Sequence, residues 1–277
     1  MHYRKDRHGE ELSILGFGCM RFQRKRGSID FEEAEREILS AIHQGVNYFD
    51  TAYIYPGSEE LLGAVLDKNH CRDQVNIATK LPHYLIRKSD DIERFFQEQL
   101  RRLKTDHIDY YLMHMLPDVT TWQRLKDLGV DRWLQEKQAA GIIRNVGFSY
   151  HGNTNAFQEL LDCRDWDFCQ IQYNYIDEHT QAGRRGLQHA AEKGIPVIIM
   201  EPLRGGRLVN ALPPKAQKAF GEFTPRRTPA EWGLRWLWDQ PEVTVVLSGM
   251  NSLEMVAENC RIASEVEAGE LGEPERE

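Results

Sequence analysis

The sequence lacks most of the short motifs that identify nucleotide-binding and metal-binding enzymes. It has no G-x-G-x-x-G run, no P-loop and no H-E-x-x-H, so it gives no support to a Rossmann dinucleotide fold, a nucleoside-triphosphate cradle or a zincin centre. Its five cysteines are scattered, odd in number and form no C-x-x-C pair. Because this pattern is typical of free thiols in a reducing compartment, we expect neither a disulfide framework nor a metal site.

A basic surface and long apolar runs are also missing. The net charge of −8 argues against a nucleic-acid partner, and we interpret the basic clusters at 24–26 and 184–185 as solvated surface. No apolar run approaches the roughly 20 residues that a membrane helix requires. Residues 1–13 are polar and do not resemble a secretion signal. We therefore expect a cytoplasmic protein that binds neither membrane nor nucleic acid.

The chain does contain a regular alternation of short apolar runs and amphipathic stretches. The expected strands are 14–20, 47–52, 75–81, 108–114, 143–150, 168–174, 196–202 and 243–249. The expected helices are 31–45, 58–69, 89–104, 120–140, 153–163, 180–194, 228–240 and 252–265. Eight strands that are each followed by a helix predict an α/β fold of the (β/α)8 TIM-barrel type. The apolar runs suit strands covered on both faces, and an open doubly wound sheet is the competing topology.

Length alone does not choose between one large domain and two small ones. With the strand count, 277 residues predict a single barrel domain over 1–265. We expect a β-hairpin around 7–12 that closes the bottom of the barrel. A long loop at 203–227 follows the seventh strand and is expected to cover a ligand at the active face. The acidic tail 266–277 is expected to fray.

Several residues predict where helices begin. Asp30 and Thr228 each stand three residues before a glutamate, as in a capping box. Ser58, Ser89 and Ser252 are further candidate N-caps.

Four polar side chains stand at or just past the ends of apolar strands, where a buried polar group needs a reason. These four residues, the tetrad, are Asp50, Tyr55, Lys80 and His114. Singly they have ordinary explanations: a turn cap, a wall residue, a lysine whose stem is buried, and a core histidine. Together they follow the second, third and fourth strands, whose carboxyl ends converge in a barrel. We therefore expect one shared pocket.

These residue types suit the reduction of a carbonyl group. Negative charge grows on the oxygen, which must receive a proton. A free tyrosine with a pKa of about 10 is a poor acid at neutral pH. A lysine ammonium nearby stabilises the phenolate, an aspartate keeps the lysine charged, and a histidine can orient the substrate oxygen.

Several longer motifs carry a resemblance to a known family. They are LGFGCMR at 15–21, D-T-A-x-x-Y-x-x-S-E-x-x-L-G at 50–63, DYYLMH at 109–114, IRNVGFS at 143–149, QIQYN at 170–174, EPLRGG at 201–206 and SGMNSLEMVAEN at 248–259. Over about 12–262 the chain resembles the aldo-keto reductase superfamily, whose barrels bind an extended nicotinamide dinucleotide without a Rossmann domain. The resemblance implies NAD(P)H-dependent reduction of an aldehyde or ketone. Tyr55 would be the general acid, tuned by Lys80 and Asp50, and His114 would orient the carbonyl.

The same resemblance implies a set of cofactor contacts. Ser149 and Gln170 match positions that hold the nicotinamide carboxamide. The strand-end positions are Cys19, Met20, Arg21, Asp50 and Met200; the pyrophosphate loop is Pro202, Leu203, Arg204 and Gly206; the adenosine end is Ser248, Gly249, Met250, Asn251, Ser252, Glu258 and Asn259.

Three departures from the family pattern bear on the cofactor. Met200 stands where many relatives stack an aromatic ring on the nicotinamide, and Tyr150 stands where many have asparagine. Gly249 and Met255 replace the lysine and arginine with which some members bind the 2′-phosphate of NADP. NADPH is the expected cofactor and NADH stays possible. NADP preference would need another cation, such as Arg204 or Arg207.

The runs at 170–183 and 198–208 resemble a branch of the family that adds a C-terminal iron–sulfur segment. No closely spaced cysteines follow Cys260, so we expect no cluster, in either a short relative or a piece of a longer one. Two alternative functions stay open: a cofactor-binding scaffold subunit with vestigial chemistry, and an electron-transfer partner of a separate iron–sulfur protein.

Loops after the strands set specificity in such barrels. Here they are 22–28, 83–88, 116–122 and 203–227, with Phe22, Tyr84 and Trp122 as candidate pocket walls.

Overall fold

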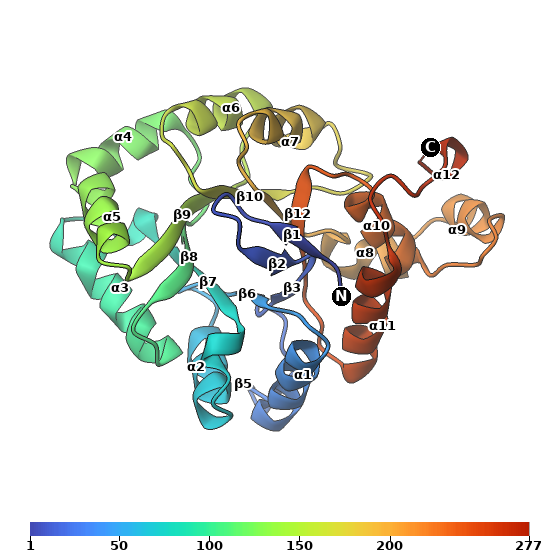
Figure 1. Ribbon diagram of the computed structural model, residues 1–277, viewed down its shortest axis with the longest axis horizontal. Coiled ribbons are helices and arrows are strands. Elements are labelled where there is room, and N and C mark those ends of the chain that lie inside the picture. Colours follow the sequence, from blue (N-terminus) through green and yellow to red (C-terminus); the bar gives the residue numbers. More distant parts are fainter. Residues whose placement is uncertain (277) are drawn as a thin grey trace.

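Eight parallel strands close into a barrel in the computed structural model, which describes residues 1–276 (Figure 1). The strands are β3 (Leu15–Gly18), β6 (Tyr48–Asp50), β7 (Asn76–Leu81), β8 (Ile108–Met113), β9 (Ile143–Tyr150), β10 (Phe168–Gln172), β11 (Val197–Met200) and β12 (Val243–Ser248). Each pairs with the next in chain order, and β12 pairs with β3 to complete the circle. The predicted TIM barrel is therefore confirmed, and the open sheet is excluded.

Helices surround the barrel and follow the strands as the sequence predicts. They are α1 (Phe31–His43), α2 (Ser58–Lys68), α3 (Asp90–Leu103), α4 (Val119–Asp127), α5 (Val130–Ala139), α6 (Thr154–Asp162), α7 (Gly183–Glu192), α10 (Pro229–Trp238) and α11 (Leu253–Glu265). The expected single helix at 120–140 was wrong, because the chain forms two. Gly129 separates them with a φ of 88°, a left-handed conformation that breaks a helix and that glycine adopts without strain.

The predicted helix caps are only partly correct. The side chains of Asp30, Thr228 and Ser252 each accept a hydrogen bond from the backbone N–H three residues later. Ser58 and Ser89 cap nothing, since their hydroxyls donate to carbonyl groups outside their helices. The hydrogen bond of Ser58 instead ties the start of α2 to the loop that follows β3.

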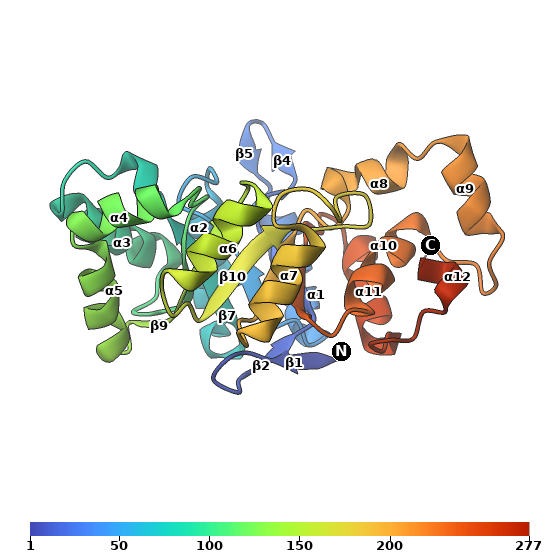
Figure 2. The same cartoon turned by 90° about the horizontal axis from the view of Figure 1, so that it is seen from above.

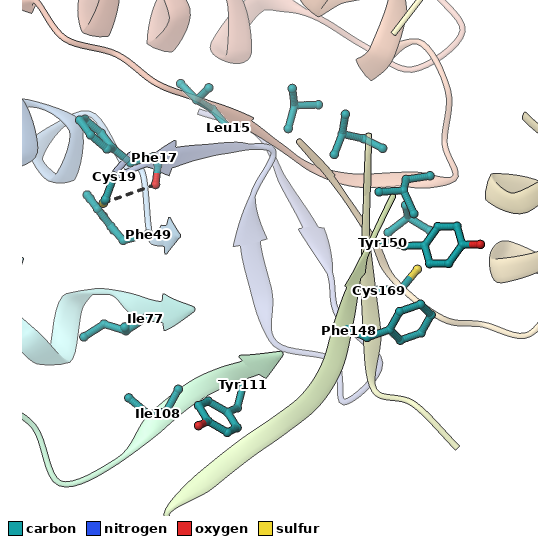
Figure 3. Packing of buried hydrophobic residues seen from close by; sticks show 14 of the residues in the cluster. Leu15, Phe17, Cys19, Phe49, Ile77, Ile108, Tyr111, Phe148, Tyr150 and Cys169 are labelled. Atoms are coloured by element: carbon teal, nitrogen blue, oxygen red, sulfur yellow. Dashed lines mark hydrogen bonds between the residues drawn. The ribbon is translucent and has the colours of Figure 1, made fainter. Parts of the chain in front are cut away.

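Side chains along most strands divide by alternation between two separate apolar clusters, except at the first residues of β8 and β12, where Ile108 and Val243 lie in the outer cluster. The inner cluster fills the barrel and consists of Leu12, Tyr48, Ala78, Tyr110, Leu112, Phe168, Ile198, Val245 and Leu247. The larger outer cluster lies between the barrel and its helices and includes Phe17, Tyr111 and Phe148 (Figure 3). A residue's parity on its strand therefore decides whether its side chain enters the barrel.

A hairpin closes the amino ends of the strands, as predicted. It pairs β1 (Tyr3–Lys5) with β2 (Glu11–Ser13). Leu12 belongs to the inner cluster, and the Tyr110 hydroxyl donates to Asp6 over 2.6 Å. Figure 2 shows a second hairpin, β4 (Arg24–Lys25) with β5 (Ser28–Ile29), on the opposite side of the barrel.

The segment after β11 contains helical turns rather than an open loop. These are η3 (Arg204–Gly206), α8 (Arg207–Asn210) and α9 (Pro214–Gly221), and Figure 2 shows α8 and α9 on the same side as β4 and β5. No helix within residues 1–276 has both the length and the apolar character to span a membrane.

The acidic tail differs from the sequence expectation, because a few specific contacts tie residues 266–276 to residues that flank α10, although most of the segment is exposed. Leu271 is buried, and its backbone N–H donates to Asp239 over 2.9 Å. Arg276 pairs with Asp239 at 2.8 Å, and Glu275 pairs with Arg227 at 2.7 Å. The ion pairs and one apolar anchor thus hold a segment whose composition alone suggests disorder.

Candidate active site

Strand parity brings three tetrad side chains to the mouth of the barrel. Asp50, Lys80 and His114 each stand two residues beyond a member of the inner cluster, on or just after β6, β7 and β8. Because side chains two residues apart share a face of the strand, all three point to the interior at the carboxyl ends. This is the end opposite the β1–β2 hairpin.

Lys80 and Asp50 form a buried ion pair at the mouth. The Lys80 Nζ donates to both Asp50 carboxylate oxygens at 2.7 Å and to the carbonyl of Thr51 at 2.6 Å. The two side chains are 1% and 6% exposed. Burial lowers the pKa of Lys80, but Asp50 and Tyr55 raise it by more, so its net pKa lies above the usual value. The lysine is therefore a fixed cation with all three N–H donors engaged.

Tyr55 comes from the turn after β6. Its carbonyl accepts from the N–H of Ser58 at 3.0 Å, and its own N–H donates to Ala52 at 3.0 Å. The Lys80 Nζ lies 5.3 Å from the centroid of the Tyr55 ring, and the His114 ring lies 6.1 Å from it at an interplanar angle of 86°. The structure thus gathers all four tetrad side chains at one end of the barrel.

The electrostatic balance at Tyr55 differs from the sequence expectation. Lys80 exerts the largest single influence and lowers the pKa of Tyr55, but burial and the nearby carboxylate of Asp50 together raise it by more. The net pKa of the phenol therefore lies above its ordinary value. The reason is that burial first, and the charge of Asp50 next, offset the effect of the lysine charge.

His114 is a neutral imidazole at physiological pH. Burial and, next, the Lys80 charge lower its pKa to about 3. Its Nδ1 is buried and has no hydrogen-bond partner among residues 1–276. The ring of Tyr84 lies 6.2 Å away. A neutral imidazole has one N–H donor, so the ring can offer a hydrogen bond to a ligand oxygen at the mouth.

Two further interior residues have polar groups suited to a ligand amide. Ser149 is fully buried, and its hydroxyl accepts from the backbone N–H of Met115 at 2.8 Å. The Gln170 side chain is 1% exposed and donates to the sulfur of Met200 at 3.6 Å. Its Oε1 is buried without a partner in the described chain. A buried acceptor without a donor is costly, and a ligand N–H would satisfy it.

Arg204 was expected to be available to a phosphate, but it is engaged. Its guanidinium forms a two-pronged ion pair with Asp177, with Nε 2.8 Å from Oδ2. Asn174 also donates to Asp177 at 2.8 Å. Arg204 chiefly, against the effect of burial, lowers the pKa of Asp177. Asp177 was not identified from the sequence as a site residue. The only feature of the sequence that points to it is its position three residues after Asn174.

Arg21 lies between the loops that follow β11 and β12. A Cβ on Gly205 would stand 2.7 Å from an Arg21 nitrogen, and a Cβ on Gly249 would stand 3.0 Å from the Arg21 Cδ. Both glycines therefore leave room for the arginine. Its charge has no carboxylate partner within residues 1–276, which makes it a better candidate for an anion than Arg204.

The expected adenosine end is divided between open and engaged groups. Glu258 accepts from the Thr228 hydroxyl at 2.9 Å, and Asn259 donates to Ser248 at 3.0 Å. The side chain of Met250 lies in the outer cluster. The structure does not bring Met250 into the barrel mouth, so its proposed contact could be made only by backbone.

The other expected cofactor residues differ in exposure. Pro202 is buried and Leu203 is half-buried, with its side chain against Gly233 of α10. The carbonyl of Asn251 accepts from Gln23 at 2.6 Å. Gly206 has a φ of 89° and Ser252 caps α11.

A cavity of about 200 Å³ adjoins the tetrad. It is lined by Cys19, Met20, Phe22, Arg24, Ile29, Ile54, Tyr55, Pro56 and Ser58. Phe22 is thus a wall residue as expected, whereas Trp122 is buried against Trp166 with ring centroids 5.0 Å apart. Sequence reasoning missed Arg24 and Ile54. A larger cavity of about 500 Å³ lies between α7, α10 and the tail.

A comparison with protein families decides what this barrel is. A model described as the Aldo/keto reductase family matches residues 14–268, which include the whole barrel and the tetrad. The chain belongs to the aldo/keto reductase family. An aldo-keto reductase of Mycobacterium sp. (strain MCS) is 29% identical over 237 residues, which are 82% of this chain and 74% of that protein.

Solved structures agree on the fold. The holo form of an aldo-keto reductase from Bacillus halodurans has a TM-score of 0.80 at 24% identity, over 100% of this chain and 94% of that one. An aldo/keto reductase from Klebsiella pneumoniae, solved with NADP and acetate, has a TM-score of 0.76 at 23% identity, over 96% and 90% of the two chains. This aldo-keto reductase is an enzyme of the oxidoreductase class. The described residues contain no cluster of three His, Cys, Asp or Glu side chains placed to hold a metal.

Proposed function

We propose that this aldo-keto reductase reduces an aldehyde or ketone to an alcohol with NADPH, or alternatively NADH, and that Tyr55 is the general acid. The observation that carries the proposal is the cluster at the barrel mouth. There the phenol ring lies 5.3 Å from a lysine ammonium and 6.1 Å from a neutral imidazole. Membership of the family supports the same reaction class.

The residues at the mouth fit a nicotinamide. The orphaned Oε1 of Gln170 can accept from the carboxamide NH₂, and the Ser149 hydroxyl lies on the same interior face. Met200 would pack against the ring as a soft, polarisable side chain. When bound, the reduced cofactor supplies a hydride to the carbonyl carbon. The Klebsiella pneumoniae relative holds NADP, which supports the assignment of a nicotinamide cofactor to this chain.

Each tetrad member has a separate role in the proposed reaction. The Tyr55 hydroxyl gives its proton to the carbonyl oxygen as that oxygen gains charge. Lys80 stabilises the phenolate that remains, and Asp50 keeps the lysine charged and in place. His114 donates a hydrogen bond from its neutral ring to the same oxygen. A proton from water then restores the phenol, so the protein ends the cycle unchanged.

The phosphates of the cofactor need cations that are not already paired. Because Arg204 is bound to Asp177, we assign the pyrophosphate side to Arg21, which lies against Gly205 and Gly249. Arg207 remains the second candidate. An arginine fork suits phosphate oxygens, and because NADPH and NADH share the pyrophosphate, this assignment fits both cofactors.

The test compares Tyr55→Phe with Tyr53→Phe. Both remove one hydroxyl, but Tyr53 packs against Phe95 and Arg102 away from the tetrad. Tyr55→Phe should lower turnover roughly 10²- to 10⁴-fold, as expected for loss of a general acid. Tyr53→Phe should leave turnover unchanged.

Turnover is measured as the aldehyde-dependent loss of NADPH absorbance, and binding as quenching of protein fluorescence by NADPH. Both variants should bind NADPH like the parent protein. Parental activity in Tyr55→Phe would contradict the assigned role. Quenching without turnover in the parent, across a panel of aldehydes and ketones, would instead indicate a cofactor-binding scaffold.

A further inference from the structure

The cavity beside Tyr55 has apolar walls and one charged group. Phe22, Ile29 and Ile54 are among its lining residues, and Tyr55 forms one part of its wall. Its volume of about 200 Å³ suits a small organic body. Apolar side chains around a single polar anchor are the usual composition of a small-molecule site. The charged group, Arg24, should therefore help to determine which compounds the cavity binds.

Arg24 is held in place by backbone groups only. It lies on β4, and its guanidinium donates to the carbonyls of Pro56 at 2.7 Å and Gly27 at 3.2 Å. These two bonds use two of its five N–H donors and fix the direction of the fork. No carboxylate lies within ion-pairing distance of it in residues 1–276, so its charge is oriented but not neutralised.

The charge around Arg24 is unusual for this molecule. Arg21, Lys25 and Arg26 also have no carboxylate partner in the part of the chain that the structure describes. Elsewhere many basic side chains are paired, and the protein as a whole carries a net charge of −8. Four uncompensated cations within six residues on the active face make a local positive field, which attracts anions. The four side chains are exposed, and Arg24 is the one among them that also lines the cavity.

We propose that the cavity binds carbonyl compounds that also carry a carboxylate, with a short apolar body between the two groups. The body lies against Phe22 and Ile54, the carbonyl faces Tyr55, and the carboxylate pairs with Arg24. A guanidinium fork binds a carboxylate through two parallel hydrogen bonds. The proposal rests on the proposed function, since it names the substrate class of the same site.

The test uses 4-carboxybenzaldehyde and its methyl ester, which share the carbonyl and the aromatic body but differ in charge. The parent protein should have the higher kcat/KM for the acid. Arg24→Gln should lower kcat/KM for the acid roughly 10- to 100-fold, mainly through KM, and should lower it for the ester by a much smaller factor, because the ester oxygen accepts a hydrogen bond but carries no charge. Arg24→Lys should give an intermediate value, because a lysine keeps the charge without the fork.

Lys25→Gln is the matched control. Lys25 is the next residue on the same strand, carries the same charge and does not line the cavity, because neighbouring side chains of a strand point to opposite faces. It should leave the ratio of acid to ester nearly unchanged. The NADPH dissociation constant, measured by fluorescence quenching, should be the same in all three variants and the parent.

Three results would overturn the inference. An unchanged acid-to-ester ratio in Arg24→Gln would show that the arginine does not bind the carboxylate. An equal loss for both compounds with weaker NADPH binding would assign Arg24 to the cofactor. An equal loss of kcat/KM for the acid in Lys25→Gln and Arg24→Gln would show that the effect comes from the overall positive charge of the segment. In each case reduction of the ester would leave the proposed function standing, whereas failure to reduce any aldehyde would refute both.

Discussion

Removing one charge of the buried pair gives the sharpest test of the site's electrostatics. In Asp50→Asn the Lys80 ammonium, 1% exposed, would keep only neutral acceptors such as the Thr51 carbonyl at 2.6 Å. Breaking a buried pair from one side costs about 3–5 kcal/mol. An asparagine can still accept one hydrogen bond, so we expect the lower end of that range near pH 7.

The loss of unfolding free energy in Asp50→Asn should depend on pH in a defined direction. Asp50 raises the pKa of Lys80 in the parent, so this stabilisation is constant below the unfolded lysine pKa of about 10.4 and declines only above it. Without Asp50 burial dominates and lowers the pKa of Lys80. The unfolded variant then binds more protons than the folded one, and its stability rises as the pH approaches 10. The gap between parent and variant should therefore narrow with rising pH.

The assay is urea unfolding of both proteins near pH 7 and near pH 10, with Asp67→Asn as the control. Asp67 contacts Lys104 at the same distance, 2.7 Å, but the two side chains are 57% and 50% exposed. Its loss should barely move the unfolding midpoint, because exposed pairs contribute little. A gap between parent and Asp50→Asn that stays constant or widens with pH would refute this reasoning.

Two further predictions concern a helix and a loop. Glu37 of α1 is fully buried without a hydrogen-bond partner among residues 1–276, and burial raises its pKa to about 7. Glu37→Gln should therefore raise the Tm near pH 8 but hardly near pH 4, which lies below the unfolded glutamate pKa of about 4.3, so that the side chain is largely neutral in both the folded and the unfolded state; equal shifts in thermal melts at the two pH values would contradict this. Gly205→Ala should weaken NADPH binding, since its φ is 63° and a Cβ would contact Arg21 at 2.7 Å. Gly269→Ala, with a φ of 76° and open space around the Cβ position, is the control for fluorescence titration, and equal affinities of the two variants would contradict the expected effect of Gly205→Ala.

The barrel was predictable because its strands are covered on both sides, which requires apolar runs along the chain. The inward direction of the Asp50, Lys80 and His114 side chains was equally local, since the face to which a side chain points follows from its position along the strand. The division of the predicted helix at Gly129 had a local signal, which is a glycine inside a helical pattern. The prediction of one helix followed the apolar periodicity of the whole segment instead. The packed tail had none: Leu271 stands alone in an acidic segment, and its partner Asp239 is 32 residues away.

The same distinction explains which candidate site residues lie where the sequence predicts. The position of Lys80 depends on its own strand, whereas the availability of Arg204 depends on Asp177, a residue 27 positions away. The pKa of Tyr55 depends on a balance between Lys80, burial and Asp50, and a sequence names the charges without their distances. Arg24 was interpreted as surface because a basic run does not reveal the cavity beneath it.

The aromatic rings inside the barrel leave its interior accessible from one end only, the end at which the tetrad lies. Below the tetrad, the ring of Tyr110 packs against those of Tyr48 and Phe168, with centroids 5.1 and 5.2 Å away, and the β1–β2 hairpin closes the far end. In the proposed reaction, the substrate, the product and the water that reprotonates Tyr55 would all pass through the open end of the barrel. The product therefore cannot leave through the opposite end of the barrel. In the proposed reaction, a product that is released slowly would delay both the water that reprotonates Tyr55 and the next substrate molecule.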